Sequence, residues 1–256
     1  MVDAVLGILA GFVSGVMSGA FGVGGAILTT PAVRVLLDAP PLVAVGTPLP
    51  AIFPTTVAGA RAYRRAGLVD GRAVRWLAPP GVAAAALGAI LTKIINAHVL
   101  LLATAALIGW QAVNVGMGRT RQDQGEGAPE PSSVALALTG AIAGFASGLL
   151  GIGGGVILVP AMTGVLHMPL KRAVGTSLVV IAFMVVPGTL VHAILGHVDW
   201  TIFLWLTLGV VPGATLGSHW TIRARERTLR LVVAVFLSLV ATLYAILELH
   251  DLITGR

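Results

Sequence analysis

Residues 18–25 read Ser-Gly-Ala-Phe-Gly-Val-Gly-Gly, and residues 147–154 read Ser-Gly-Leu-Leu-Gly-Ile-Gly-Gly. Each stretch interrupts a long apolar run, at 4–37 or 134–166. About 20 apolar residues cross a bilayer core once, so each run is too long for one crossing and too short for two. Glycine permits backbone turns that other residues resist. The pattern therefore predicts a helix broken near its middle, with arms of about 13–15 residues on either side.

The composition is that of a membrane protein. Of the 256 residues, 57% are hydrophobic and 10% are charged, and the mean hydropathy is +0.97, whereas a soluble domain carries about 25% charged residues. The start, Met1-Val2-Asp3, lacks the basic residues of a signal peptide, so we expect the first apolar run to belong to the mature fold. We expect an all-α polytopic protein of the inner membrane. Further apolar runs with the length of one crossing lie at 42–60, 76–95, 97–117, 173–195, 202–220 and 229–249.

An internal repeat relates the two glycine breaks. Adding 129 to a residue number carries the first stretch onto the second, and one offset serves about 70 residues without a gap. Glycine matches arise easily in this composition, but matches of Trp, Asp, Pro and Thr under one offset do not. The chain therefore reads as two homologous halves, 1–117 and 134–256, joined by a polar linker at 118–133. The matched pairs include Thr47 with Thr176, Asp70 with Asp199, and Trp76 with Trp205.

The basic residues decide between two topologies. If each broken run crossed the membrane once, the 16 Lys and Arg would divide evenly between the two sides. If each run is a re-entrant hairpin that returns to the side it entered, 13 of the Lys and Arg lie on one side of the membrane, and only Arg34, Lys93 and Arg256 lie on the other. Positive residues in short loops favour the cytoplasm. We therefore predict two inverted-topology repeats, each a Gly-broken re-entrant hairpin followed by three transmembrane helices, with the 118–133 linker cytoplasmic and both termini periplasmic.

The paired breaks predict a binding site. Inverted repeats with broken helices hold their ligands near the membrane midplane. Two glycine tips that met there would present bare backbone N–H groups at 23–27 and 152–157, which suits an anion and needs no buried cation. The alternative is that the glycines serve only close helix packing. The candidate substrate-binding residues are Ser18, Gly19, Gly22, Gly24, Gly25, Thr47, Ser147, Gly148, Gly151, Gly153, Gly154, Thr176 and Ser177.

Several of these polar residues also have an ordinary structural interpretation. Thr47 and Thr176 lie near the start of a helix, where a hydroxyl often bonds the nearby backbone. Asp70 precedes a helix, and an N-cap is the favoured interpretation there. His192 lies in an apolar run and is a candidate to carry a coupling proton; the alternative is a hydrogen-bonded interfacial histidine.

Two copies of Ser-Gly-x-x-Gly-x-Gly-Gly, followed by an apolar stretch and then Pro31 or Pro160, resemble the sulfite exporter TauE/SafE family of membrane transporters. Val-Gly-Thr at 45–47 and 174–176, and Gly-x-Val-Asp at 196–199, extend the likeness over nearly the whole chain. The resemblance implies transport of sulfite, organosulfonates or related anions.

The first copy departs from the second at two positions. Ala26 stands where the second copy has Gly155, and Pro48 stands opposite Ser177. We therefore expect two unequal half-sites.

The expected function is a secondary transporter that exports a small sulfur-containing anion by alternating access around a midplane site. Transport of another small anion, and a membrane scaffold without transport, are the alternatives. The sequence has no Cys, no His-x-x-x-His and no pair of intramembrane carboxylates, so no enzyme, metal site or cofactor is expected. It also has no ATP-binding loop of the form Gly-x-x-x-x-Gly-Lys-Ser/Thr. The energy for transport would therefore come from a proton or sodium gradient or from the substrate's own gradient. Its basic residues lie in short loops, so nucleic acid is not an expected partner. The expected partners are the anion and the lipid bilayer; a homodimer is left open.

Overall fold

The computed structural model describes residues 2–92, 131–151 and 153–224, together with positions 95, 99, 100, 103, 106, 228, 232, 235 and 242. Every regular element within this part of the chain is a helix. The all-α membrane fold class is thereby confirmed. Most residues of the crossings expected at 97–117 and 229–249, and most of the 118–133 linker, lie outside the described residues.

Among the described residues, the first half contributes five helices. They are α1 (Val2–Phe21), α2 (Ala26–Leu36), α3 (Pro41–Gly46), α4 (Pro48–Arg65) and α5 (Gly71–Leu91).

The second half follows the same plan. It contains α7 (Ser133–Leu150), α8 (Gly155–Pro160), the π-helical turn η1 (Ala161–Val165), α9 (Leu170–Ile194) and α10 (Trp200–Arg223). Across the described residues, six segments are long and apolar enough to cross a membrane: α1, α3 with α4, α5, α7, α9 and α10.

The breaks fall where the glycine motifs predict them, but the expectation of arms of similar length is wrong. The first arms, α1 and α7, have 20 and 18 residues, or about 30 Å of helix. The returning arms, Ala26–Leu36 and Gly155–Val165, are the two shorter apolar helices. The reason is that α1 and α7 stay helical through the first part of each glycine motif, to Phe21 and Leu150, so each break falls beyond the midpoint of its segment.

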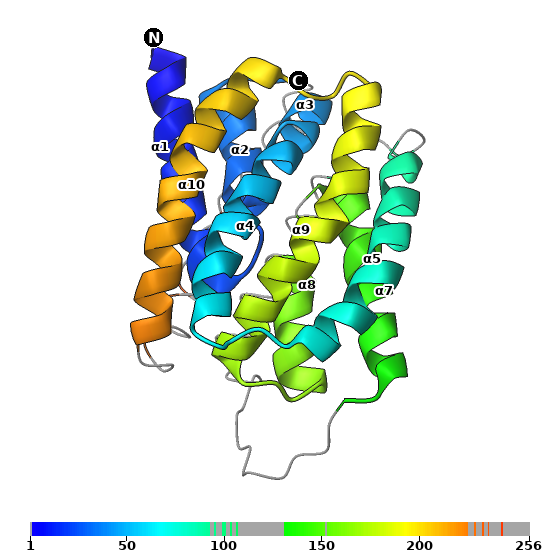
Figure 1. Ribbon diagram of the computed structural model, residues 1–256. Helices are drawn as coiled ribbons and strands as arrows, with labels where there is room; N and C mark the ends of the chain where they lie inside the picture. Colours follow the sequence, from blue (N-terminus) through cyan, green and yellow to red (C-terminus); the bar gives the residue numbers. More distant parts are fainter. Residues whose placement is uncertain are drawn as a thin grey trace.

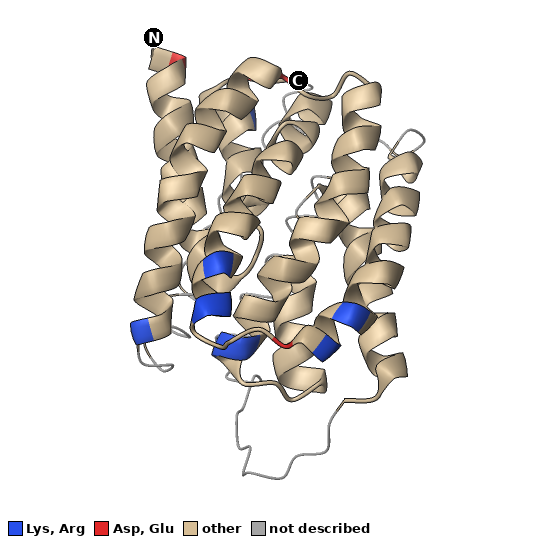
Figure 2. Cartoon of the chain, in the orientation of Figure 1, with Lys and Arg blue, Asp and Glu red and all other residues tan. Residues whose placement is uncertain are grey.

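Each broken segment enters and returns at one end of the molecule. In Figure 1, α1 starts at the upper end and α2 leads back toward it, whereas α7 starts at the lower end and α8 leads back there. Figure 2 shows Lys and Arg gathered at the lower end, where α4 and α10 finish and α5 and α9 start. The chain thus has one strongly basic end.

Glycines let each broken helix pack closely on a helix of the other half. A β-carbon on Gly11, Gly15 or Gly19 of α1 would collide with the backbone of α10. Likewise, a β-carbon on Gly144 or Gly148 of α7 would collide with the backbone of α5. Small residues allow this approach, which stabilises helix pairs in lipid through van der Waals contact. The packing interpretation is therefore correct for these glycines of α1 and α7. Helices α4 and α9 contact each other and lie between the pair α1–α10 and the pair α5–α7.

Candidate functional site

Three glycines turn the chain at each break. Gly22, Gly24 and Gly25 have φ of 69°, 86° and 86°. At the matching positions of the second half, 151, 153 and 154, φ is 67°, 81° and 72°. Residues with a side chain rarely adopt such angles, because the β-carbon meets the adjacent carbonyl oxygen. The six glycines thus shape two tips of the same geometry, which we call tip 1 (residues 22–25) and tip 2 (residues 151–154).

The two tips touch. A β-carbon built on Gly153 would lie 3.6 Å from the α-carbon of Gly24, and one on Gly155 would collide with the carbonyl oxygen of Gly22. Val23 and Val156 beside them are buried. The structure therefore brings the N-terminal ends of α2 and Gly155–Val165 together inside the protein, from opposite ends of the molecule.

The tips carry backbone donors without acceptors. The N–H groups of residues 23–27 donate no hydrogen bond to the described chain, and neither do those of residues 153–156. Hydrogen bonding resumes at Leu28, whose N–H donates to Gly25, and at Ile157, whose N–H donates to Gly154. A buried, unpaired N–H costs free energy comparable to a lost hydrogen bond. Two such groups of donors, side by side and out of water, can be satisfied together by a ligand rich in acceptor oxygens.

Serines lie behind both tips. The hydroxyl of Ser18 is fully buried without a hydrogen-bond partner in the described chain, close to Gly25. Its counterpart Ser147 is buried beside Gly154. In contrast, the hydroxyl of Ser14 donates to the Gly25 carbonyl. Ser18 is thus a donor that the fold leaves available next to the bare amides.

Both tips lie in a region of the chain that matches a known protein family. The family model described as "Sulfite exporter TauE/SafE" matches residues 7–244, a span that includes both tips. The chain belongs to the sulfite exporter TauE/SafE family. It is therefore a multi-pass protein of a membrane transporter family.

Curated relatives of this TauE/SafE protein carry matching names. It is 29% identical to "Probable membrane transporter protein YunE" of Bacillus subtilis, over 92% of this chain and 95% of the relative. It is 32% identical to a "Probable membrane transporter protein" of Xylella fastidiosa, over 82% of this chain and 80% of the relative. No solved structure matches the chain.

The carbonyl end of α1 is closed by side chains of two other helices. The Tyr63 hydroxyl of α4 donates to the Gly19 carbonyl at 3.0 Å, and the Thr221 hydroxyl of α10 donates to the Ala20 carbonyl at 3.0 Å. These bonds satisfy acceptors that a helix end leaves open, while the donors of tip 1 stay open. Sequence reasoning missed Tyr63, although the offset of 129 pairs it with His192.

The predicted site residues of this TauE/SafE protein fall into distinct groups. Tip 1 and tip 2 gather Ser18, Gly24, Gly25, Ser147, Gly153 and Gly154. Gly22 and Gly151 join the tips to the opposite half: Ser177 donates to the Gly22 carbonyl at 3.0 Å, and Gly151 lies against Val45. Gly19 and Gly148 instead sit in the helix–helix contacts.

The two threonines bond to loops of the other half. The backbone N–H of Asp199 donates to the Thr47 hydroxyl, and that of Asp70 donates to the Thr176 hydroxyl, each at 2.9 Å. Both aspartates are N-caps, since each side chain accepts from the N–H groups two and three residues on. Both threonines therefore have a structural partner.

His192 is buried near the end of α9. Its Nδ1 is 3.3 Å from the Nδ1 of His197, so one of the two rings donates to the other. Its Nε2 is buried without a hydrogen-bond partner in the described chain. Burial lowers the pKa of His197, which lies in the loop after α9.

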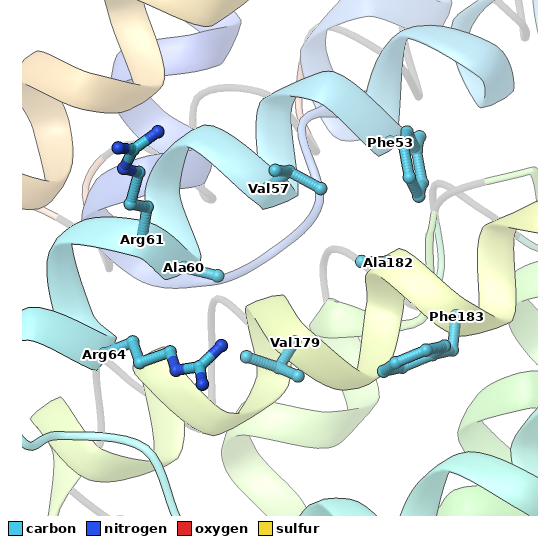
Figure 3. Close-up of a pocket in the computed structure, with 8 residues that line it drawn as sticks. All are labelled: Phe53, Val57, Ala60, Arg61, Arg64, Val179, Ala182 and Phe183. Carbon is cyan, nitrogen blue, oxygen red and sulfur yellow. The ribbon is translucent and has the colours of Figure 1, made fainter.

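A groove that sequence reasoning did not predict runs between α4 and α9. It holds about 490 Å³ and is drawn in Figure 3. Arg61 and Arg64 line one part of it, although the sequence had assigned them only to topology. No single stretch signals this groove, because its two walls come from different halves of the chain.

Proposed function

We propose that this protein is a secondary transporter that exports a small sulfur-containing anion, such as sulfite or an organosulfonate, across the inner membrane. The observation that carries the proposal is the contact between two glycine tips whose buried N–H groups have no acceptor in the described chain. The family description supports the substrate class.

The chemistry of the tips suits such an anion. A sulfite or sulfonate group has three oxygens, each able to accept more than one hydrogen bond. Backbone amides turned by positive-φ glycines form concave anion sites, which P-loops also use. No Lys or Arg among the described residues is buried, so the anion would be held by neutral donors. Neutral donors in a low-dielectric site bind an anion without the strong attraction of a buried cation, which favours release.

We further propose that the halves, 1–117 and 134–256, are inverted repeats. In support, positive-φ residues recur at the offset of 129, including the non-glycine pair Asp38 and His167 with φ of 48° and 54°. The basic end would face the cytoplasm, together with the 118–133 linker, and both termini would face the periplasm.

Alternating access can use the paired threonine bonds. The Asp199–Thr47 bond joins the loop between α9 and α10 to the residue that precedes α4. The Asp70–Thr176 bond joins the loop between α4 and α5 to α9. Each joins the two halves, so rocking of one half against the other would break one bond while keeping the other. Both bonds are formed in this structure, and in our proposal a protein with both bonds formed is occluded on both sides. His192, paired with His197, is our candidate for proton coupling.

The test is flux of sulfite and small sulfonates from proteoliposomes under an imposed proton or sodium gradient. The variant Ser18→Ala removes the unpaired hydroxyl, and Gly25→Ala distorts a positive-φ turn of tip 1. Gly164→Ala is the matched control, because nothing lies within 4 Å of its β-carbon position. We expect flux by the wild type and the control, and reduced flux by both tip variants.

Two results would oppose the proposal. Flux that Ser18→Ala and Gly25→Ala leave unchanged would remove the tips from the pathway. Flux of other anions, with none of sulfite or sulfonates, would overturn the substrate class, and no flux of any anion would favour a scaffold.

A further inference from the structure

The groove between α4 and α9 has a cationic end and an apolar end. Figure 3 shows the Arg64 side chain extended toward Val179 at one end, and the rings of Phe53 and Phe183 on opposite walls at the other. Phe53 is 47% exposed and Phe183 is 53% exposed, so both rings face out of the protein core. The remaining lining residues are Val57, Ala60, Arg61 and Ala182.

The two arginines of the groove are available to a ligand. Neither Arg61 nor Arg64 has an ion pair or hydrogen bond within the described chain. Both are exposed and lie on the last turns of α4, at the basic end of the molecule. In Figure 3 the Arg61 guanidinium points away from that of Arg64, but both side chains are exposed and leave α4 one turn apart, so both can turn toward one phosphate. Arginine suits a phosphate because it offers several N–H donors in a planar fork.

The length of the groove matches one leaflet of a bilayer. Phe53 and Arg64 are 11 residues apart on α4, which is about 16 Å at 1.5 Å per residue. Half of a hydrocarbon core is about 15 Å. A small oxyanion would use only the arginine end and would leave the two rings without a role, whereas a lipid with one acyl chain beside the rings uses both ends.

We propose that an anionic phospholipid binds in this groove, with its phosphate on Arg61 and Arg64 and an acyl chain between Phe53 and Phe183. The leaflet follows from the orientation proposed above and is the cytoplasmic one; the binding itself does not depend on transport. Because α4 belongs to the first half and α9 to the second, the bound lipid bridges the two halves at their contact. Basic pockets between membrane helices bind anionic headgroups in this way.

The experiment measures lipid binding to the purified, delipidated full chain by native mass spectrometry and thermal shift. The probes are phosphatidylglycerol, phosphatidylcholine with the same chains, and soluble glycerol phosphate. We expect phosphatidylglycerol to bind and to raise Tm, phosphatidylcholine to bind more weakly, and glycerol phosphate to have no effect. Arg61→Gln with Arg64→Gln weakens phosphatidylglycerol binding by about fivefold for each arginine. Arg65→Gln, a neighbour outside the groove, leaves it unchanged.

A second variant tests the apolar end. Ala182→Phe fills the groove between the rings without changing charge, and we expect it to reduce phosphatidylglycerol binding as well. Equal stabilisation by glycerol phosphate would replace the lipid with a small-anion site, and equal binding of phosphatidylcholine would show an unselective apolar surface. Equal loss in Arg65→Gln would show general surface charge. Each of these results overturns the proposal, and none of them bears on sulfite flux, so its failure is distinguishable from that of the transport function.

Discussion

The backbone N–H of Asp70 donates a hydrogen bond of 2.9 Å to the hydroxyl of Thr176, although the two residues are 106 positions apart. Asp199 and Thr47 form the same bond at the same distance. The offset of 129 converts one pair into the other, with the donor and acceptor exchanged between halves. The contacts between the halves therefore repeat, and they do so at the two opposite loops of the fold.

The threonine bonds predict opposite changes in access. Thr176→Val removes one acceptor and Thr47→Val removes the other, at a cost of about 1 kcal/mol of stability each. The chain has no Cys, so single cysteines at Val69 or Val198 report on the two loops. We expect Thr176→Val to speed maleimide labelling of Val69→Cys, and Thr47→Val to speed labelling of Val198→Cys. Equal labelling in both variants would mean that the bonds do not control access.

Ser18 and Ser14 predict a contrast between binding and stability. The Ser18 hydroxyl is buried and unpaired, so Ser18→Ala removes a polar group that the apo fold does not need. We expect unchanged or raised Tm and about fivefold weaker binding of sulfite. Ser14→Ala removes the donor to the Gly25 carbonyl, and we expect lower Tm. A fall in Tm for Ser18→Ala without weaker binding would assign Ser18 to the fold alone.

Packing glycines and tip glycines predict different failures. Gly19→Ala places a β-carbon against the Ala214 carbonyl and forces α1 away from α10. We expect a lower yield of folded protein and lower Tm. The β-carbon of Gly25→Ala has its nearest contact with the Ser14 hydroxyl at 3.3 Å and also lies beside the Ser18 side chain, so it meets no backbone. The backbone there has φ of 86°, which costs about 1–3 kcal/mol. We expect folded protein with little flux, measured on samples matched for folded content by size-exclusion chromatography. Normal flux in folded Gly25→Ala would contradict this.

The histidine pair predicts a pH dependence. Burial lowers the pKa of His197, so the unfolded chain binds this proton more readily than the folded one. The resulting loss of stability begins as pH falls through the unfolded value of about 6.5. We expect Tm to decrease between pH 7.5 and 5, and we expect a smaller decrease for His197→Gln. An unchanged slope in the variant would mean that other groups set the dependence.

The sequence predicted the location of the breaks and the features that follow from short-range pattern. Glycines at 22, 24 and 25 are spaced as a turn requires, and all three have positive φ. Asp70 and Asp199 cap helices as local chemistry indicates. The division between Gly19, which packs on α10, and Gly25, which shapes a tip, depends on contacts between distant segments. The same holds for the partners of Thr47 and Thr176.

Arm length and the groove escaped prediction for a related reason. Apolar composition marks where a helix fits lipid, but it does not show that α1 stays helical through the start of its glycine motif to Phe21, where Gly19 packs against α10. In a membrane protein sequence, an arginine near the end of an apolar run, such as Arg64, indicates which end faces the cytoplasm and no more. Its place opposite Val179 arises only when α4 and α9 come together.

The central claim is that the unpaired amides of both tips together bind one anion. Selenite is a close analogue of sulfite, and its selenium scatters X-rays anomalously, so a crystal grown with selenite reports the position of the anion directly. We expect an anomalous peak beside the contact of Gly24 with Gly153, within hydrogen-bond distance of backbone nitrogens from both tips and lost in Ser18→Ala crystals at limiting selenite. A fully occupied peak elsewhere in the membrane region, with the tips still in contact and empty, would contradict it.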